Sequence, residues 1–108
     1  MTNLKDVDVL HERCILVGVN LKKNEHFTYT MEELANLADA LNVEVVGTVT
    51  QNLERVTGSH YVGTGKIQEI KGFYDEADAN LVIFNDELSP SQIRNLERDL
   101  ECKVIDRT

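Results

Sequence analysis

Apolar residues fall into short blocks along this chain, and four of the blocks have the length of a β-strand. Cys14–Val19 (CILVGV) is a nearly continuous apolar run, as expected for a central parallel strand that is buried on both faces. Val43–Val49 and Leu81–Phe84 read as two further strands, and Lys103–Asp106 begins a fourth. The pattern therefore predicts four strands.

Between these blocks, apolar residues recur at helical spacing. The first predicted helix begins with a capping-box pattern, Thr30 followed by Glu33, and its apolar positions are Leu34, Leu37, Ala38 and Leu41. The second follows a long loop over residues 50–64, and its apolar positions are Ile67, Ile70 and Tyr74. The third has the strongest start in the chain, Ser89-Pro90-Ser91-Gln92, and its apolar positions are Ile93, Leu96 and Leu100.

Strands that alternate with helices predict the fold class. We expect a single small α/β domain over residues 12–108, with a mainly parallel four-stranded sheet and helices on both faces. Residues 1–11 are expected to form an N-terminal tail.

Length and composition limit the number of domains and the cellular compartment that we expect. A chain of 108 residues is long enough for one domain with a real core. No apolar run approaches the roughly 18 residues that a membrane span needs, and the first residues lack the pattern of a signal peptide. Cys14 and Cys102 lie far apart and fit no metal or redox spacing, so we expect two reduced thiols in a cytoplasmic monomer.

The net charge of −8 argues against nucleic-acid binding by charge alone. The acidic residues are unevenly distributed, however. The segment 53–72 carries Arg55, Lys66 and Lys71 against Glu54 and Glu69, with a histidine in addition. That segment alone is mildly cationic.

The stretch YVGTGKIQEI, residues 61–70, resembles a phosphate-binding loop but fails the template. A P-loop that ended at Gly65-Lys66 would need glycine at position 60 and Ser or Thr at position 67, where this chain has His60 and Ile67. The hydroxyl that would bind Mg²⁺ is therefore missing. The sequence contains no other GTPase or hydrolase motif that we can identify, so we predict no catalytic residue and no metal site in this chain.

Two interpretations of the glycines and the lysine remain. In one, Gly63 and Gly65 permit a tight turn with positive φ, and Lys66 is a solvated side chain. In the other, free amides at a helix start and Lys66 bind one RNA phosphate, and Tyr61 stacks on a base. The candidates for RNA or phosphate contact are Arg55, His60, Tyr61, Gly63, Gly65, Lys66 and Lys71.

A second candidate site lies where the third strand ends. Asp86 and Glu87 occupy the carboxyl edge of the predicted sheet, where open α/β sheets usually bind ligands. Adjacent carboxylates on a loop usually point apart, so we favour solvated or helix-capping roles over a metal or a base. The alternative ligand site consists of Gly18, Asn20, Asp86 and Glu87.

Three blocks carry a family resemblance: YVGTGKIQEI, then IFNDELSPSQIRNLE, then KVIDRT. In this order and spacing they resemble the N-terminal domain of the HflX family of ribosome-associated GTPases, over roughly residues 12–108. The positions that fit the family pattern in the last two blocks are Asp86, Glu87, Leu88, Ser89, Pro90, Gln92, Asn95, Leu96, Asp106 and Arg107. The loop NLERVTGSH departs from the pattern because it lacks an expected proline.

The resemblance implies that this chain is a fragment. In the family, a helical hairpin and a GTPase domain follow, so GTP and Mg²⁺ would bind outside these residues and no cofactor is expected within them. The intact proteins bind the large ribosomal subunit and separate stalled or idle ribosomes. An ATP-linked activity has also been proposed to involve the N-terminal region.

Two functions from different classes are therefore predicted. The favoured one is a non-catalytic module that contacts ribosomal RNA and proteins of the large subunit, alongside its own GTPase domain. The alternative is an ATP-binding or weakly ATPase domain that uses the carboxyl edge of the sheet near Asp86, with Lys66 as a phosphate contact.

Overall fold

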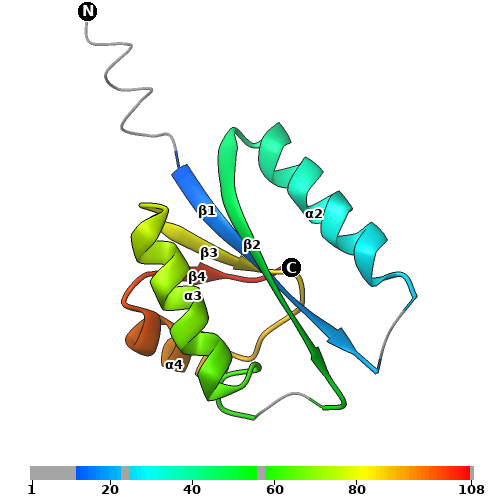
Figure 1. Cartoon of the computed structure of the whole chain (residues 1–108), viewed down its shortest axis with the longest axis vertical. Coiled ribbons are helices and arrows are strands. Elements are labelled where there is room, and N and C mark those ends of the chain that lie inside the picture. The colour runs from blue at the N-terminus through cyan, green and yellow to red at the C-terminus, as the bar shows by residue number, and fades with distance from the viewer. Residues whose placement is uncertain (1–11, 23–24, 56–57, 108) are drawn as a thin grey trace, which may run out of the picture.

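The computed structural model describes residues 12–22, 25–55 and 58–107 (Figure 1). The predicted tail, residues 1–11, lies outside the described residues. The elements in chain order are β1 (Glu12–Leu21), α2 (Phe27–Ala40), β2 (Val43–Leu53), α3 (Thr64–Glu76), β3 (Leu81–Phe84), α4 (Pro90–Leu100) and β4 (Lys103–Ile105).

The four strands form one sheet in the order β2-β1-β3-β4, and every neighbouring pair is parallel. The central strand, β1, pairs with β2 on one side and β3 on the other. Its residues are buried from Cys14 to Val19, which explains the continuous apolar run. The predicted four-stranded parallel α/β fold is confirmed.

Helices cover the two faces of the sheet unequally. One buried cluster joins the sheet to α3 and α4 through Ile67, Ile70 and Leu96, and a second joins it to α2 through Met31 and Leu34. Figure 1 shows α2 on one side of the sheet and α3 with α4 on the other. The prediction of helices on both faces is therefore confirmed.

The predicted start of the first helix is wrong. The helix α2 begins at Phe27, before Thr30, and its N-cap residue makes no side-chain cap. The Thr30 hydroxyl instead donates to the Phe27 carbonyl within the first turn at 2.8 Å, and Glu33 pairs with Arg107. The start of α4 matches the prediction: Ser89 and Gln92 form a complete capping box, with Pro90 in the first turn.

The predicted loop over residues 50–64 is also shorter than expected. The strand β2 continues to Leu53, because residues 50–53 pair with residues 18–21 of β1. At the other end of the sheet, β4 ends at Ile105 rather than Asp106. Among the described helices, none has the length and apolar character that crossing a membrane requires.

Candidate functional site

The start of α3 is uncapped by any side chain. Its N-cap residue, Gly63, has extended dihedral angles of φ −72° and ψ 158°, and its amide donates to Gln51 Oε1 at 3.2 Å. Within the described residues, the amides of Thr64 and Gly65 have no hydrogen-bond partner. Lys66 lies in this first turn, as predicted. Two open amides and one lysine therefore lie in the same first turn.

The expected positive φ at the glycines is wrong. No described glycine has a positive φ, and in the loop before α3 it is Tyr61 that lies in the left-handed region, at φ 70°. A Cβ atom added at Gly65 would meet nothing within 4 Å, and one at Gly63 would meet only Gln51 Nε2, at 3.4 Å. The backbone conformation therefore does not require glycine at either position. Valine there would not introduce the strain that a positive φ implies.

The lysines of α3 have acidic partners. Lys66 Nζ lies 2.9 Å from Glu69 Oε1, and Lys71 Nζ lies 3.2 Å from Glu101 Oε2. Arg55 is exposed and lies just after the end of β2. A phosphate that approached α3 would therefore meet partly compensated charges, and it would have to displace Glu69 to pair fully with Lys66.

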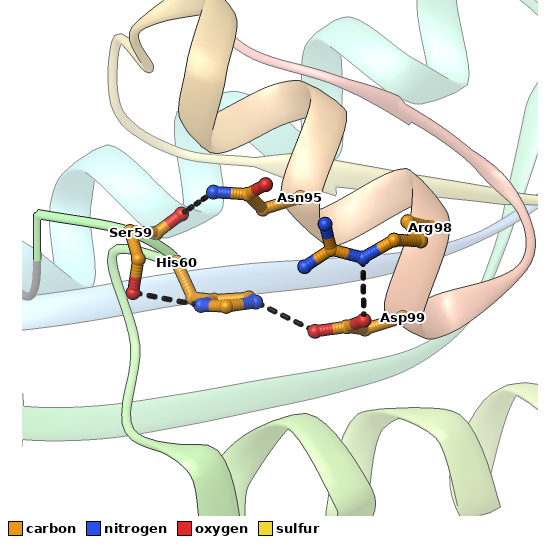
Figure 2. A network of polar contacts seen from close by, with 5 residues as sticks. All are labelled: Ser59, His60, Asn95, Arg98 and Asp99. Carbon is orange, nitrogen blue, oxygen red and sulfur yellow. Dashed lines mark hydrogen bonds and ion pairs between the residues drawn. The ribbon is translucent and has the colours of Figure 1, made fainter.

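His60 joins the loop before α3 to α4 (Figure 2). Its Nε2 atom lies 2.6 Å from Asp99 Oδ2, and its Nδ1 atom lies 2.8 Å from Ser59 Oγ. Asp99 also accepts from Arg98 Nε at 3.1 Å, and Asn95 Nδ2 donates to the Ser59 carbonyl at 3.0 Å. Arg98 and then His60 hold the pKa of Asp99 below its usual value. The imidazole is thus part of an internal contact between two elements.

Tyr61 packs against the sheet. Its ring meets Phe84 edge to face, with ring centroids 6.4 Å apart and the planes at 86°. Burial, and then the nearby Asp86 carboxylate that accepts from the hydroxyl, raise the pKa of Tyr61 to about 12. In this conformation Phe84 contacts the ring, which reduces the surface available for stacking on a base.

Asp86 lies at the carboxyl edge of the sheet, as predicted for this position. Burial raises the pKa of its carboxyl group, although hydrogen bonds from Tyr61 and the Val19 amide oppose the shift. The carboxylate borders a hollow of about 440 Å³, which we call the carboxyl-edge hollow. It is lined by Val19, Leu21, Phe27, Thr30, Tyr61, Asn85, Asp86 and Arg107. The neighbouring Glu87 is exposed.

The other members of the alternative ligand site lie elsewhere. A Cβ atom at Gly18 would stand 2.4 Å from Met31 Sδ and 2.9 Å from Phe27, so the missing side chain lets α2 pack on β1. Asn20 borders a different hollow, formed with residues 52–54. The structure therefore does not bring Gly18, Asn20 and Asp86 together in one hollow.

Arg107 is a functional candidate that the sequence interpretation did not assign a role. Its Nη1 atom donates to Asn85 Oδ1 at 2.7 Å and to the Thr30 carbonyl at 3.2 Å, and its Nη2 atom pairs with Glu33. Its backbone amide donates to the Asp86 carbonyl at 3.3 Å. The guanidinium thus connects α2 with the segments that follow β3 and β4. Its place in the KVIDRT block was the only sequence signal.

Several residues that carry the family resemblance have structural roles. Asp106 Oδ2 accepts from the Leu88 amide at 2.8 Å, which fixes the loop between β3 and α4. Ser89 and Gln92 cap α4. Among the described residues, no group of three or more histidine, cysteine or acidic side chains is arranged to hold a metal ion.

Comparison with known proteins identifies the family. A family described as GTP-binding GTPase N-terminal matches residues 28–108. A protein named GTPase HflX from Alkalihalophilus pseudofirmus is 46% identical over 109 residues, which cover 100% of this chain and 25% of that protein. Another GTPase HflX, from Lacrimispora saccharolytica, is 43% identical over 108 residues, with 100% and 26% covered. The chain thus spans about a quarter of these relatives.

Solved structures share the fold. A crystal structure of a variant of a protein called SsGBP has a TM-score of 0.64 and 21% identity, and the match covers 87% of this chain and 28% of that one. A complex of SsGBP with GDP has a TM-score of 0.63 and 24% identity, with 87% and 26% covered. Together with the match over residues 28–108, these comparisons lead to one conclusion: the chain belongs to the family of GTP-binding GTPase N-terminal domains and corresponds to the N-terminal part of the HflX GTPases.

Proposed function

We propose that this domain is a non-catalytic module through which an HflX-type GTPase contacts the large ribosomal subunit and helps to separate stalled or idle ribosomes. GTP and Mg²⁺ act in the GTPase domain that accompanies it, and the module works as a cytoplasmic monomer beside that domain. Membership of the family supports this proposal, because the relatives that match along the whole of this chain are named as GTPases.

The observation that carries the contact proposal is the uncapped start of α3. The open amides of Thr64 and Gly65 point out of a helix end whose dipole is positive, and Lys66 lies in the same turn. Such a site fits one phosphate of an RNA backbone. The acidic remainder of the surface stays in solvent or meets basic ribosomal proteins, since a net charge of −8 would repel bulk RNA.

Co-sedimentation with purified large subunits tests this function. The 108-residue chain and a longer protein that includes the GTPase domain are each sedimented with large subunits at several salt concentrations. We expect the longer protein to bind more tightly than the domain alone, and a longer protein without residues 12–108 to bind more weakly. Equal binding with and without these residues would contradict a ribosome-contacting role.

One observation favours a second candidate, nucleotide binding. The carboxyl-edge hollow lies between the ends of β1 and β3, two neighbouring strands whose following helices lead to opposite edges of the sheet. Open α/β proteins commonly bind nucleotides at such a position. Against it, Lys66 does not line this hollow. Titration with ATP and Mg²⁺ separates the two functions, because saturable binding that Asp86→Asn alters would support the nucleotide site.

A further inference from the structure

The two edges of the sheet differ in length and in charge. One edge is β4, which has 3 residues and begins with the charged Lys103. The other is β2, which has 11 residues, and its residues 45–53 (VVGTVTQNL) include no charged residue and no proline. Proteins commonly protect an edge strand by making it short or by placing lysine or proline on it, because its open backbone groups can pair with another strand. The edge at β4 has such protection, and the edge at β2 lacks it.

The backbone of β2 directs hydrogen-bonding groups away from the sheet. The Leu53 carbonyl accepts from the Lys22 amide at 2.9 Å, so the backbone groups of Leu53 point toward β1. Alternate residues of a parallel strand direct both of their backbone groups to the same side, so Thr48, Thr50 and Asn52 direct theirs outward. Within the described residues these outward groups have no partner, because β2 has a neighbour on one side only, and all three side chains are exposed. An extended segment can therefore pair with β2 from outside.

The helix α2 places acidic side chains beside this edge. Ala35 packs in the same cluster as Val43 and Val45 of β2, so this side of the helix faces that strand. Glu32 and Asp39 lie three positions before and four positions after Ala35, and residues at this spacing share one side of a helix. Both are exposed, and α2 contains no lysine or arginine. The α2 side of the edge is therefore negatively charged.

The helix α3 has acidic side chains beside the same edge on the other face of the sheet. A Cβ atom added at Gly47 would overlap the Phe73 ring, so Phe73 lies directly over β2. Glu69 and Glu76 lie four positions before and three positions after Phe73, on the same side of α3. Glu69 pairs with Lys66, and Glu76 is exposed. The edge of β2, which crosses in front of β1 between the two helices in Figure 1, thus has net negative charge on both sides.

These charges identify the kind of strand that can pair here. Side chains of an added strand point alternately toward the α2 face and the α3 face, so basic side chains would meet carboxylates on either face. A second copy of this chain would bring the same acidic helices and a net charge of −8, which disfavours self-pairing. An RNA strand would bring phosphates, which the carboxylates repel. The occupant that fits is a basic polypeptide segment.

We propose that the outer edge of β2 binds an extended, basic segment of another protein, which adds to the four-stranded sheet as a further strand beside residues 47–53. This inference deepens the proposed function and rests on it in one respect, namely that a basic protein of the large subunit supplies the segment. Backbone hydrogen bonds to Thr48, Thr50 and Asn52 provide affinity. The carboxylates of α2 and α3 provide the preference for lysine and arginine.

Binding of a defined peptide tests the edge without ribosomes. The probe is a peptide of about nine residues in which pairs of lysines alternate with pairs of valines, so that both faces of the strand carry lysine. Hydrogen exchange of the 108-residue chain is followed by NMR. We expect saturating peptide to slow exchange at the outward amides of Thr48, Thr50 and Asn52 about tenfold. The amides of Val49 and Gln51, which face β1, should change little.

Altered peptides and variants separate backbone pairing from charge. A peptide N-methylated at its valines keeps the charge but should give no protection, and a peptide with glutamate in place of lysine should bind at least about tenfold more weakly. Glu32→Lys and Glu76→Lys should each weaken binding of the lysine peptide about fivefold at low salt. Glu87→Lys is the matched control, because this exposed residue follows β3, which β1 separates from β2.

Three results would overturn the proposal. The first is no binding of the lysine peptide at about 1 mM, and the second is equal binding of the N-methylated peptide. The third is protection of the outward amides that grows with the concentration of the chain alone, with dimers in sedimentation, because a second copy would then occupy the edge. Peptide binding by a protein that does not bind large subunits would support the edge site and contradict the proposed function instead, so the two failures are distinct.

Discussion

The starts of α3 and α4 share one backbone geometry but differ in every group around it. Their N-cap residues have nearly identical dihedral angles, φ −72° and ψ 158° for Gly63 and φ −76° and ψ 157° for Ser89. At the third helical position α3 has Lys66, whereas α4 has Gln92. One start is open and cationic, and the other is closed by its own side chains.

The two helix starts differ in whether their own side chains satisfy the first backbone amides. In α4, the Ser89 hydroxyl accepts from the Gln92 amide at 3.2 Å, the Gln92 side chain accepts from the Ser89 amide at 2.8 Å, and Pro90 has no amide to satisfy. In α3, the amides of Thr64 and Gly65 have no partner in the part of the chain that the structure describes. A helix start that is not capped by its own residues can bind an external acceptor, which is why we assign the contact to α3.

The largest expected effect concerns the turn that precedes α3. The start of α3 lacks a side-chain cap. The turn before it contains Tyr61, whose hydroxyl donates to the Asp86 carboxylate. Tyr61→Phe removes a hydrogen bond to a charged group and should lower the free energy of unfolding by about 1.5 kcal/mol in urea unfolding. Tyr29→Phe, on an exposed tyrosine, is the control and should change little. An unchanged midpoint for Tyr61→Phe would show that this contact does not hold the turn.

The same contact predicts a dependence on alkaline pH. The pKa of Tyr61 rises from its ordinary value of 10.0 to about 12 in the folded protein, so the neutral form is favoured by folding. This contribution to stability is fully present below pH 10 and is lost as the pH rises through about 12. The stability difference between the wild type and Tyr61→Phe should therefore be constant at neutral pH and shrink above about pH 10. Urea unfolding at several alkaline pH values measures it.

Removing the cap of α4 should have the next largest effect. Ser89→Ala should lower the free energy of unfolding by about 1 kcal/mol, since the Gln92 amide loses its acceptor. Binding to the large subunit should stay at the wild-type level, because this start is closed to external groups. A loss of binding without a loss of stability would place the contact at α4 and reverse the comparison.

Local signals explain which helix starts the sequence could predict. At α4, the cap, the proline and the glutamine lie within four residues and act on one another, so the pattern fixed the start. At α2, the same kind of pattern was misleading. Both residues make tertiary contacts instead of a cap: Thr30 accepts from Asn85 at 3.1 Å, and Glu33 pairs with Arg107. Such partners lie more than fifty positions away, and no local rule finds them.

The sequence predicted where the candidate residues lie in the fold, but not which side chains they contact. The sequence placed Lys66 in the first turn of a helix and Asp86 at the carboxyl edge of the sheet, and the structure has both there. A long-range partner of His60, however, is Asp99 on α4, 39 positions away. That pairing depends on how α4 packs beside the loop before α3, which hydrophobic spacing does not specify.

A smaller effect on stability is expected when α3 is given the cap of α4. Gly63→Ser should raise the free energy of unfolding by only a few tenths of a kcal/mol, since glycine is itself acceptable at an N-cap. The added Cβ meets only Gln51 Nε2 at 3.4 Å, so the serine fits. If the open amides bind phosphate, the new hydroxyl competes for one of them and large-subunit binding should weaken. Gly65→Ala, with no atom near its Cβ, is the control. Wild-type binding by Gly63→Ser would remove the amides from the contact.

The smallest effect on stability, and the sharpest on binding, is expected from Lys66→Ala in a protein that includes the GTPase domain. The change removes a cation from a helix start, where the dipole disfavours it, but also removes the pair with Glu69, so the stability of the domain should change by no more than a few tenths of a kcal/mol. Loss of one phosphate contact should weaken binding to the large subunit and reduce the slope of log K against log salt by roughly one unit. Lys103→Ala is the matched control, because this exposed lysine begins β4 at the opposite edge of the sheet. If Lys66→Ala and Lys103→Ala give the same affinity and the same salt slope, Lys66 serves only its pair with Glu69, and the open start of α3 makes no ionic contact with the ribosome.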